Sequence, residues 1–251
     1  MTMARGLTIT ALGGALGPIG AEVRDIDLAE PQPDAVHEQL RAALCAFGVL
    51  VARRQRLTHA QHEALADRLG QVTSVRRGRE QSGSGGWRVE ATFTRTPPSA
   101  TMLSVHTRPA NAGDLRWQSM TAACDALSSG LRRTLTGLRA VHRDAARGGE
   151  AVHPVITRHP VTGRDVLFVN PAYTVGFEDW TRAESAALLR FLFAHAAHPG
   201  FGVRLRGEPG TMVWWDNRQV WHRVADARPE SRAVVSRSTF AGTVPAAAAG
   251  Q

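Results

Sequence analysis

Apolar positions near the start of the chain change from helical to extended spacing. Val36, Leu40 and Leu44 recur every three or four residues, which predicts an amphipathic helix over residues 34–47. The apolar run at 49–52 that follows it has the composition of a buried strand. A helix followed at once by a buried strand indicates a helix packed against a sheet.

Capping patterns mark two further helices. Thr58 with Gln61, and Thr181 with Glu184, have the spacing of a capping box, in which each side chain accepts a hydrogen bond from the other residue's backbone N–H. They predict helices that begin at these threonines. The segment 76–86, in contrast, contains four glycines and almost no apolar residue, and we expect a mobile loop there.

Much of the remaining chain has the pattern of short strands separated by turns. Helical spacing returns only around residues 120–127 and 129–142. Strands are predicted at 87–117, 153–158, 166–170, 202–205, 211–216 and 232–240. The fold class predicted from this mixture is α+β, with helices flanking a sheet core.

The size and cysteine content of the chain indicate one domain. Its 251 residues, 43% of them hydrophobic, suffice for one sizeable core. We expect a single domain over residues 1–242 and a flexible tail over 243–251. Cys45 and Cys124 lie in apolar helical segments and do not form a disulfide framework, so we expect a cytoplasmic protein.

The positive charge of the chain does not indicate a nucleic-acid partner. The net charge is +8, but the 30 basic residues are all arginines and are scattered along the sequence. No apolar run approaches the roughly 20 residues that span a bilayer. We therefore expect neither nucleic acid nor membrane as partner, and a small-molecule substrate instead. A homo-oligomer or a partner protein stays open.

Seven phrases cover nearly the whole chain and lie at 21–28, 47–70, 96–103, 113–117, 153–170, 184–195 and 209–224. Their content and order resemble the TauD/TfdA (taurine dioxygenase) family of iron and 2-oxoglutarate dioxygenases. The resemblance implies a double-stranded β-helix, also called a jelly roll, with helices around it.

The resemblance also implies where iron would bind. Relatives use a histidine and a carboxylate two residues apart, just after a tryptophan, and a second histidine far downstream. Here the first slot reads Trp87-Arg88-Val89-Glu90, and the distal histidine is His222. Arginine stays protonated and repels a cation. We therefore expect no metal, or, if one binds, His222 and Glu90 as its ligands.

The positions that hold 2-oxoglutarate in relatives are altered as well. The family's threonine and arginine for the distal carboxylate correspond to Leu115 and Ala233, whereas a second arginine, used on substrate anions by the sulfonate branch, corresponds to Arg237. No cofactor is therefore favoured, and Fe(II) with 2-oxoglutarate is the alternative.

Eight residues are candidates for the site. We expect the catalytic groups to be His222 and Glu90, which could pass a proton, with Arg88 to stabilise negative charge. The candidates for substrate binding are Arg237, Trp87, Trp221, Asn170 and Trp117.

Three functions remain open. The first is an enzyme with degraded iron and 2-oxoglutarate sites that performs iron-independent, non-oxidative chemistry on a small, biosynthetic molecule. The second is an active Fe(II)/2-oxoglutarate-dependent dioxygenase with atypical ligands. The third is a catalytically inert binding partner.

Overall fold

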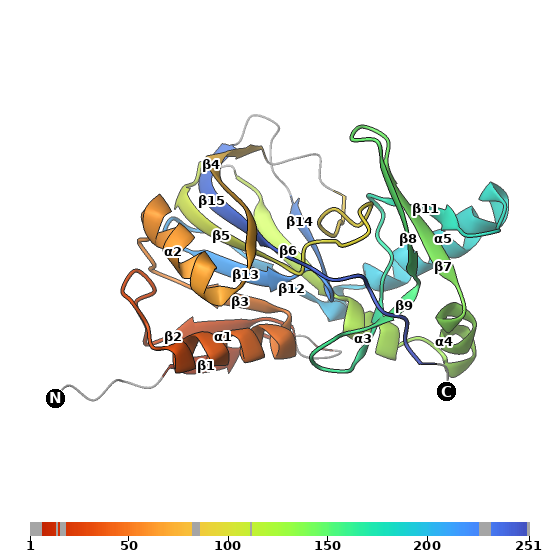
Figure 1. Cartoon of the computed structure of the whole chain (residues 1–251), viewed down its shortest axis with the longest axis horizontal. Coiled ribbons are helices and arrows are strands. Elements are labelled where there is room, and N and C mark those ends of the chain that lie inside the picture. Colours follow the sequence, from red (N-terminus) through yellow and green to blue (C-terminus); the bar gives the residue numbers. More distant parts are fainter. Residues whose placement is uncertain are drawn as a thin grey trace.

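A computed structural model describes residues 7–13, 15, 19–81, 86–110, 112–225 and 232–249 (Figure 1). Five helices are described: α1 (Asp34–Phe47), α2 (His59–Leu69), α3 (Met120–Asp125), α4 (Ser129–Thr136) and α5 (Arg182–Ala196), with the 3-10 turn η1 (Pro199–Phe201). The remaining elements are strands, and they form four sheets.

The largest sheet has seven strands in the order β1-β2-β3-β13-β5-β15-β4. Their bounds are β1 (Thr8–Ala11), β2 (Ala21–Arg24), β3 (Val49–Ala52), β13 (Met212–Asp216), β5 (Ala100–Thr107), β15 (Arg232–Phe240) and β4 (Val72–Gln81). Only the β2–β3 pair is parallel among these described strands. Neighbours in this sheet are therefore mostly distant in sequence, as expected for a jelly roll.

A three-stranded sheet, β12-β6-β14, faces the large one. Its strands are β12 (Gly202–Leu205), β6 (Asp114–Ser119) and β14 (Val220–Ala225). A second three-stranded sheet contains β11 (Thr174–Phe177), β7 (Arg139–Asp144) and β8 (Gly149–Pro154), and β9 (Ile156–Arg158) pairs with β10 (Asp165–Leu167). The predicted α+β jelly roll is confirmed.

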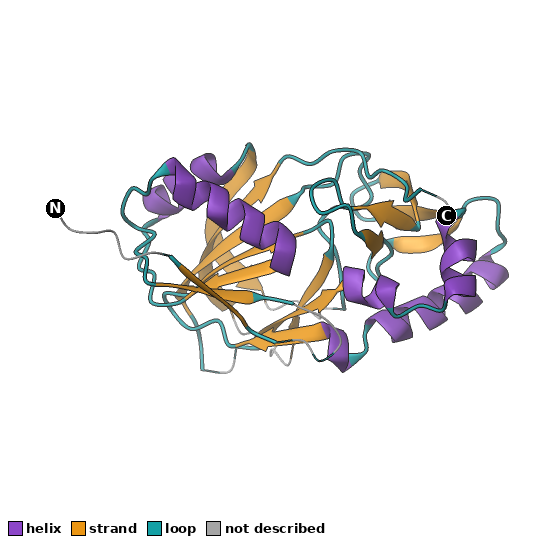
Figure 2. Cartoon of the chain, turned by 90° about the horizontal axis from the view of Figure 1, so that it is seen from below, coloured by secondary structure: helices purple, strands orange, loops and turns teal. Residues whose placement is uncertain are grey.

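Alternation along the strands separates two cores. In β13, Trp214 packs toward α1 and α2, whereas Val213 and Trp215 point into the space between the two facing sheets. In β5 the same division places Met102 on the helix side and Leu103 on the inner side. Successive side chains of a strand point to opposite faces, so one strand contributes to both cores. Figure 1 and Figure 2 show α1 and α2 on the outer side of the large sheet, whereas the other helices lie at the opposite end of the molecule.

The predicted capping boxes are present at the starts of α2 and α5. Thr58 accepts from the Gln61 backbone, and Thr181 accepts from the Glu184 backbone, while each partner side chain returns to the threonine. A third core lies under α3 and α5 and contains the fully buried Trp221. No described helix has the length and apolarity needed to cross a bilayer. The cytoplasmic location and the oligomeric state stay predictions.

Three segments differ from the sequence-based predictions. The helix predicted over 129–142 ends at Thr136, and Arg139–Asp144 form β7. The predicted mobile loop at 76–86 is wrong for its first part, because residues 76–81 belong to β4 and pair with β15; residues 82–85 lie outside the described residues. Residues 243–249, which were predicted to belong to a flexible tail, contact the rest of the fold. Ala248 is buried, and its amide donates to Ile156 O at 3.1 Å. Backbone pairing, which leaves no mark in the pattern of side chains, orders the latter two segments.

Candidate functional site

A cavity of about 350 Å³ lies between the two facing sheets. Its wall contains Glu90, Trp117, Tyr173, Trp215 and His222, together with an unusual concentration of arginines: Arg76, Arg79, Arg88, Arg147, Arg223 and Arg237. Glu90 is the one carboxylate among the described residues of this wall. Such a cavity attracts anions.

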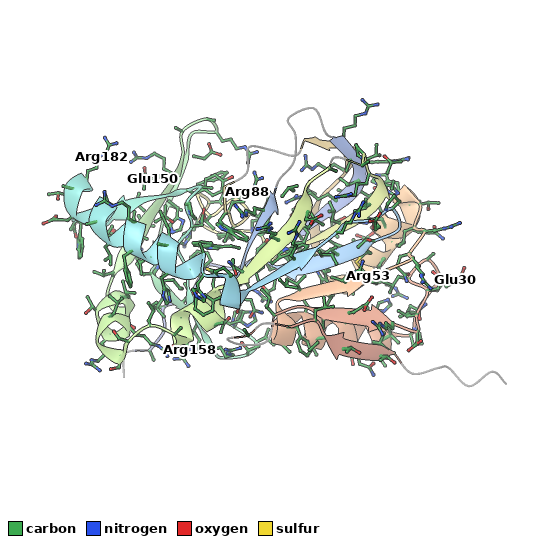
Figure 3. The ribbon with its side chains drawn as sticks, turned by 180° about the vertical axis from the view of Figure 1, so that it is seen from behind. Glu30, Arg53, Arg88, Glu150, Arg158 and Arg182 are labelled. Carbon is green, nitrogen blue, oxygen red and sulfur yellow. The ribbon has the colours of Figure 1, made fainter. Side chains whose placement is uncertain are left out.

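Arg88 and His222 lie opposite each other on antiparallel backbone. Arg88 N donates to His222 O at 3.2 Å, and His222 N donates to Arg88 O at 2.9 Å. Residues paired in this way have Cα atoms about 5.5 Å apart. The arginine therefore stands beside the distal histidine, and Figure 3 shows Arg88 between the facing sheets and α5.

His222 is held as a neutral imidazole. Burial and the positive charges of Arg237 and Arg88 keep the pKa of His222 well below its usual value. Its ring lies against Trp215, with 5.1 Å between the centroids. Nδ1 is buried and has no hydrogen-bond partner among the described residues. A neutral imidazole with a ring nitrogen to spare can bind a metal or exchange a proton.

Glu90 forms an ion pair with Arg237, between Oε2 and Nη2. The Arg237 guanidinium also lies over the Trp215 ring, at 5.5 Å from its centroid. Burial and the nearby Glu90 carboxylate raise the pKa of Tyr173, which keeps the phenol protonated. Five of the predicted residues, namely Arg88, Glu90, Trp117, His222 and Arg237, thus line one cavity.

Two of the predicted substrate-binding residues, Trp221 and Asn170, lie outside the wall of the cavity. Trp221 is fully buried in the third core, where Nε1 donates to Val169 O at 2.7 Å. Its position next to His222 in β14 turns it to the opposite face. Asn170 is also buried, and its side-chain amide donates to Thr92 Oγ1 at 2.9 Å. Both side chains stabilise the scaffold.

Trp87 lies at the margin of the cavity rather than in its wall. It packs on the third core, and its ring supports the Arg223 guanidinium at 4.6 Å from the ring centroid. A cation over an indole face is attracted by the ring quadrupole. Trp87 therefore positions a charge that lines the cavity.

The turn before His222 is braced by Asp216. This buried carboxylate accepts from His159 Nε2 at 2.9 Å and from Arg218 Nη2 at 2.6 Å. Although burial raises the pKa of Asp216, the hydrogen bonds from Arg218 and His159 lower it to about 2. Asn217 donates to Thr101 Oγ1 at 3.0 Å. These hydrogen bonds hold the turn that leads into β14 and so fix the position of His222.

Four arginines of the cavity were not found from the sequence. Arg76 and Arg79 come from β4, which was predicted as a loop. Arg147 comes from the β7–β8 turn and Arg223 from β14. Because side chains alternate along β14, Arg223 would be expected to point away from the cavity that His222 lines. β4 and the β7–β8 turn reach the cavity only through tertiary contacts, which the local sequence does not reveal.

The family model described as taurine catabolism dioxygenase TauD, TfdA family, matches residues 8–239. The chain belongs to the TauD/TfdA family. A taurine dioxygenase structure from Burkholderia xenovorans superimposes with a TM-score of 0.88 and 32% identity over 98% of this chain and 94% of that one. The family assignment made from the ordered phrases is confirmed.

The matches to individual TauD/TfdA relatives cover different shares of those proteins. The α-ketoglutarate-dependent dioxygenase cnsM of Penicillium expansum is 37% identical over 59% of this chain, and the match covers 47% of that relative, so about half its length. The α-ketoglutarate-dependent sulfate ester dioxygenase of Pseudomonas putida is 28% identical over 94% of this chain and 90% of its own length.

The prediction that no cofactor is favoured is wrong. Relatives are named as α-ketoglutarate-dependent dioxygenases, and AAD-2, which shares the fold at 24% identity, has been solved with Mn(II) and N-oxalylglycine. The names of these relatives favour the dioxygenase alternative over iron-independent chemistry.

The cavity supplies only part of the expected metal site. Among the described residues of its wall, His222 and Glu90 are the candidate ligands, and the neighbouring Arg88 cannot ligate a cation. A group of three potential ligands, Cys45, His159 and Asp216, lies elsewhere, but His159 Nε2 bonds Asp216 and Nδ1 accepts from the Thr162 amide at 3.1 Å. The residues present do not fit a three-ligand site.

Proposed function

We propose that this TauD/TfdA protein is an α-ketoglutarate-dependent dioxygenase with an atypical ligand set that oxidises a small organic anion. The observation that carries the proposal is the meeting of His222 and Glu90 in an arginine-lined cavity. Bound iron and 2-oxoglutarate would supply the oxidising chemistry. His222 and Glu90 are the residues that would hold the metal.

The ligand set explains why metal affinity should be low. A guanidinium near a divalent cation opposes binding, since two like unit charges about 4 Å apart cost roughly 4 kcal/mol at an effective dielectric constant of 20. The Glu90 carboxylate is shared with Arg237, which competes with the metal for the same oxygens. We therefore expect iron to bind best when 2-oxoglutarate, an anion, is also present.

The arginines define the class of substrate. The wall contains six arginines and one described carboxylate, so its formal charge favours molecules with carboxylate, sulfonate or sulfate groups. Relatives are named for such molecules: a sulfate ester in Pseudomonas putida and 2,4-dichlorophenoxyacetate in Burkholderia. Arg237, half of the pair with Glu90, is placed to receive the anionic group.

The aromatic side chains exclude water from the reacting end. Trp117 and Trp215 are each buried, with 5.8 Å between their ring centroids, and both line the cavity beside His222. Removing water strengthens every charge interaction in the cavity. Tyr173, kept protonated, can donate a hydrogen bond to a bound anion or to Glu90.

Succinate formation tests the proposal. Purified protein would be loaded with Fe(II) without oxygen, mixed with 2-oxoglutarate and then exposed to air. We expect succinate above the level of the His222→Ala variant, and more of it with a matching substrate anion. Absence of succinate across a panel of sulfonates, sulfate esters and carboxylates would overturn the proposal.

A further inference from the structure

A second, smaller pocket opens next to the arginine-lined cavity. It has a volume of about 40 Å³ and shares Leu103, Leu115 and Val224 with the cavity wall. A site of about 10–15 Å³ admits one water. The small pocket therefore has room for a group the size of a carboxylate, and a ligand in the cavity can extend into it.

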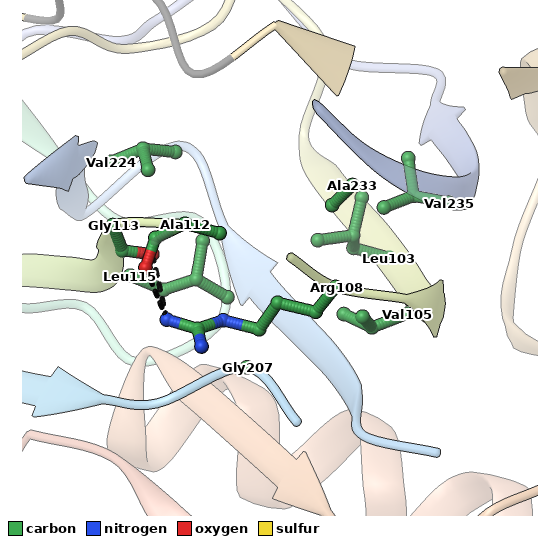
Figure 4. Close-up of a pocket in the computed structure, with 10 residues that line it drawn as sticks. All are labelled: Leu103, Val105, Arg108, Ala112, Gly113, Leu115, Gly207, Val224, Ala233 and Val235. Carbon is green, nitrogen blue, oxygen red and sulfur yellow. Dashed lines mark hydrogen bonds between the residues drawn. The ribbon is translucent and has the colours of Figure 1, made fainter. Parts of the chain in front are cut away.

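The wall of the small pocket is apolar except for one side chain. Aliphatic groups come from β5, β6, β14 and β15, including Val105, Ala233 and Val235. Arg108 crosses this pocket, and Figure 4 shows its guanidinium reaching the carbonyls of Ala112 and Gly113. A charged group in such surroundings is costly to bury unless it is paired.

The pairing of Arg108 is incomplete. Its side chain is 6% exposed. The bonds to Ala112 O, to Gly113 O at 3.5 Å and to Asp114 Oδ1 at 3.4 Å all come from Nη2. Asp114 is shared with Arg204, whose Nε lies 2.5 Å from Oδ2. Two arginines with one carboxylate leave a formal charge of +1, and Nη1 and Nε of Arg108 have no described partner.

We propose that Arg108 binds the terminal carboxylate of a linear dicarboxylate whose other end lies in the arginine-lined cavity. Leu103, Leu115 and Val224 then enclose the methylene chain at the junction, and the far carboxylate meets a buried guanidinium. This inference rests on the proposed function, because 2-oxoglutarate is a dicarboxylate of this class. The residue that would bind the terminal carboxylate, Arg108, comes from the loop between β5 and β6.

Calorimetric titration of metal-free protein with glutarate and with n-pentanoate tests the inference. The two acids have the same five-carbon chain, but n-pentanoate ends in a methyl group. We expect glutarate to bind at least tenfold more tightly. Equal affinities, or tighter binding of n-pentanoate, would overturn the inference, because an apolar pocket prefers the methyl end.

Two variants locate the carboxylate. Arg108→Gln should reduce glutarate affinity at least tenfold and leave n-pentanoate affinity within twofold, whereas Arg204→Gln, which removes the other partner of Asp114, should retain glutarate binding. If Arg108→Gln does not fold, Ala233→Asp, which adds a competing carboxylate, should give the same loss. Full glutarate affinity in a folded variant of either kind would place the carboxylate elsewhere. Succinate formation is not needed for this test, so its outcome is independent of catalysis.

Discussion

Arg88 and His222 are joined by two backbone hydrogen bonds, so the guanidinium and the imidazole project from opposite positions on two antiparallel segments, β14 and the isolated bridge at Arg88. This pairing holds a permanent positive charge beside the one histidine that the described cavity wall provides. Burial and Arg237 lower the pKa of His222, and Arg88 adds to their effect. The same positive charge is the reason for the weak metal binding that we expect. The predictions below follow from this arrangement and from the surrounding contacts.

Replacing Arg88 by histidine should strengthen metal binding. The substitution removes the opposing charge and adds an imidazole beside His222. We expect Mn(II) affinity to rise at least tenfold, measured by equilibrium dialysis without oxygen. Arg223→His, in the same cavity wall and supported by Trp87, is the control and should have a smaller effect. Equal gains in Mn(II) affinity in both variants would contradict the claim that Arg88 opposes metal binding because it lies beside His222.

Replacing Glu90 by glutamine should change metal and anion binding in opposite directions. The variant loses a candidate ligand, and Arg237 loses its carboxylate partner. We expect Mn(II) affinity to fall about tenfold and sulfate affinity to rise by a similar factor. Dialysis against each ion measures both effects. A parallel loss of both affinities would indicate a collapsed cavity and would contradict the assigned contacts.

Trp221→Phe should lower stability and leave the cavity intact. The variant removes the Nε1 donor and leaves Val169 O buried without its partner, which costs roughly 1–3 kcal/mol in the free energy of unfolding. Urea unfolding measures this change. Glutarate affinity should stay within twofold of the wild type, whereas Trp117→Phe, in the cavity wall, should change it. A large loss of affinity in Trp221→Phe would restore its predicted substrate role.

Stability should fall as the pH drops below about 6.5. Burial lowers the pKa of His62 to about 4 and that of His142 to about 3, from the ordinary 6.5. Between these values the unfolded chain binds more protons than the folded one, so the free energy of unfolding falls with pH, by up to about 1.4 kcal/mol per pH unit for each histidine.

Urea unfolding at pH 7, 6 and 5 would measure this slope. His62→Gln should flatten it by about one histidine's share, and His198→Gln, an exposed position, should leave it unchanged. A free energy of unfolding that stays constant between pH 7 and pH 5 would be inconsistent with neutral, buried histidines.

The sequence predicted those parts of the molecule that depend on contacts between residues close together in the chain. The capping boxes at Thr58 and Thr181 mark observed helix ends, because the capping bonds join residues three apart. Arg88 was expected at a ligand position of the family because the flanking phrases match the family without gaps. Its proximity to His222 followed from the family resemblance.

Other features depend on contacts that the local sequence does not contain. β4 has a loop-like composition, yet β15 pairs with it and brings Arg76 and Arg79 to the cavity. The burial of Trp221 on the opposite face of β14 can be deduced from strand alternation only once His222 is known to point into the cavity. Arg108 is noticed only after its pocket is formed, since its partners are backbone carbonyls and Asp114.

Iron binding in the presence of 2-oxoglutarate tests the central claim most directly. Protein, Fe(II) and 2-oxoglutarate would be equilibrated by dialysis without oxygen, and the bound iron measured for the wild type, His222→Ala and His198→Ala. We predict close to one iron per chain for the wild type and His198→Ala, and almost none for His222→Ala. No bound iron in the wild type, or undiminished iron in His222→Ala, would contradict the claim that this cavity is a modified dioxygenase site.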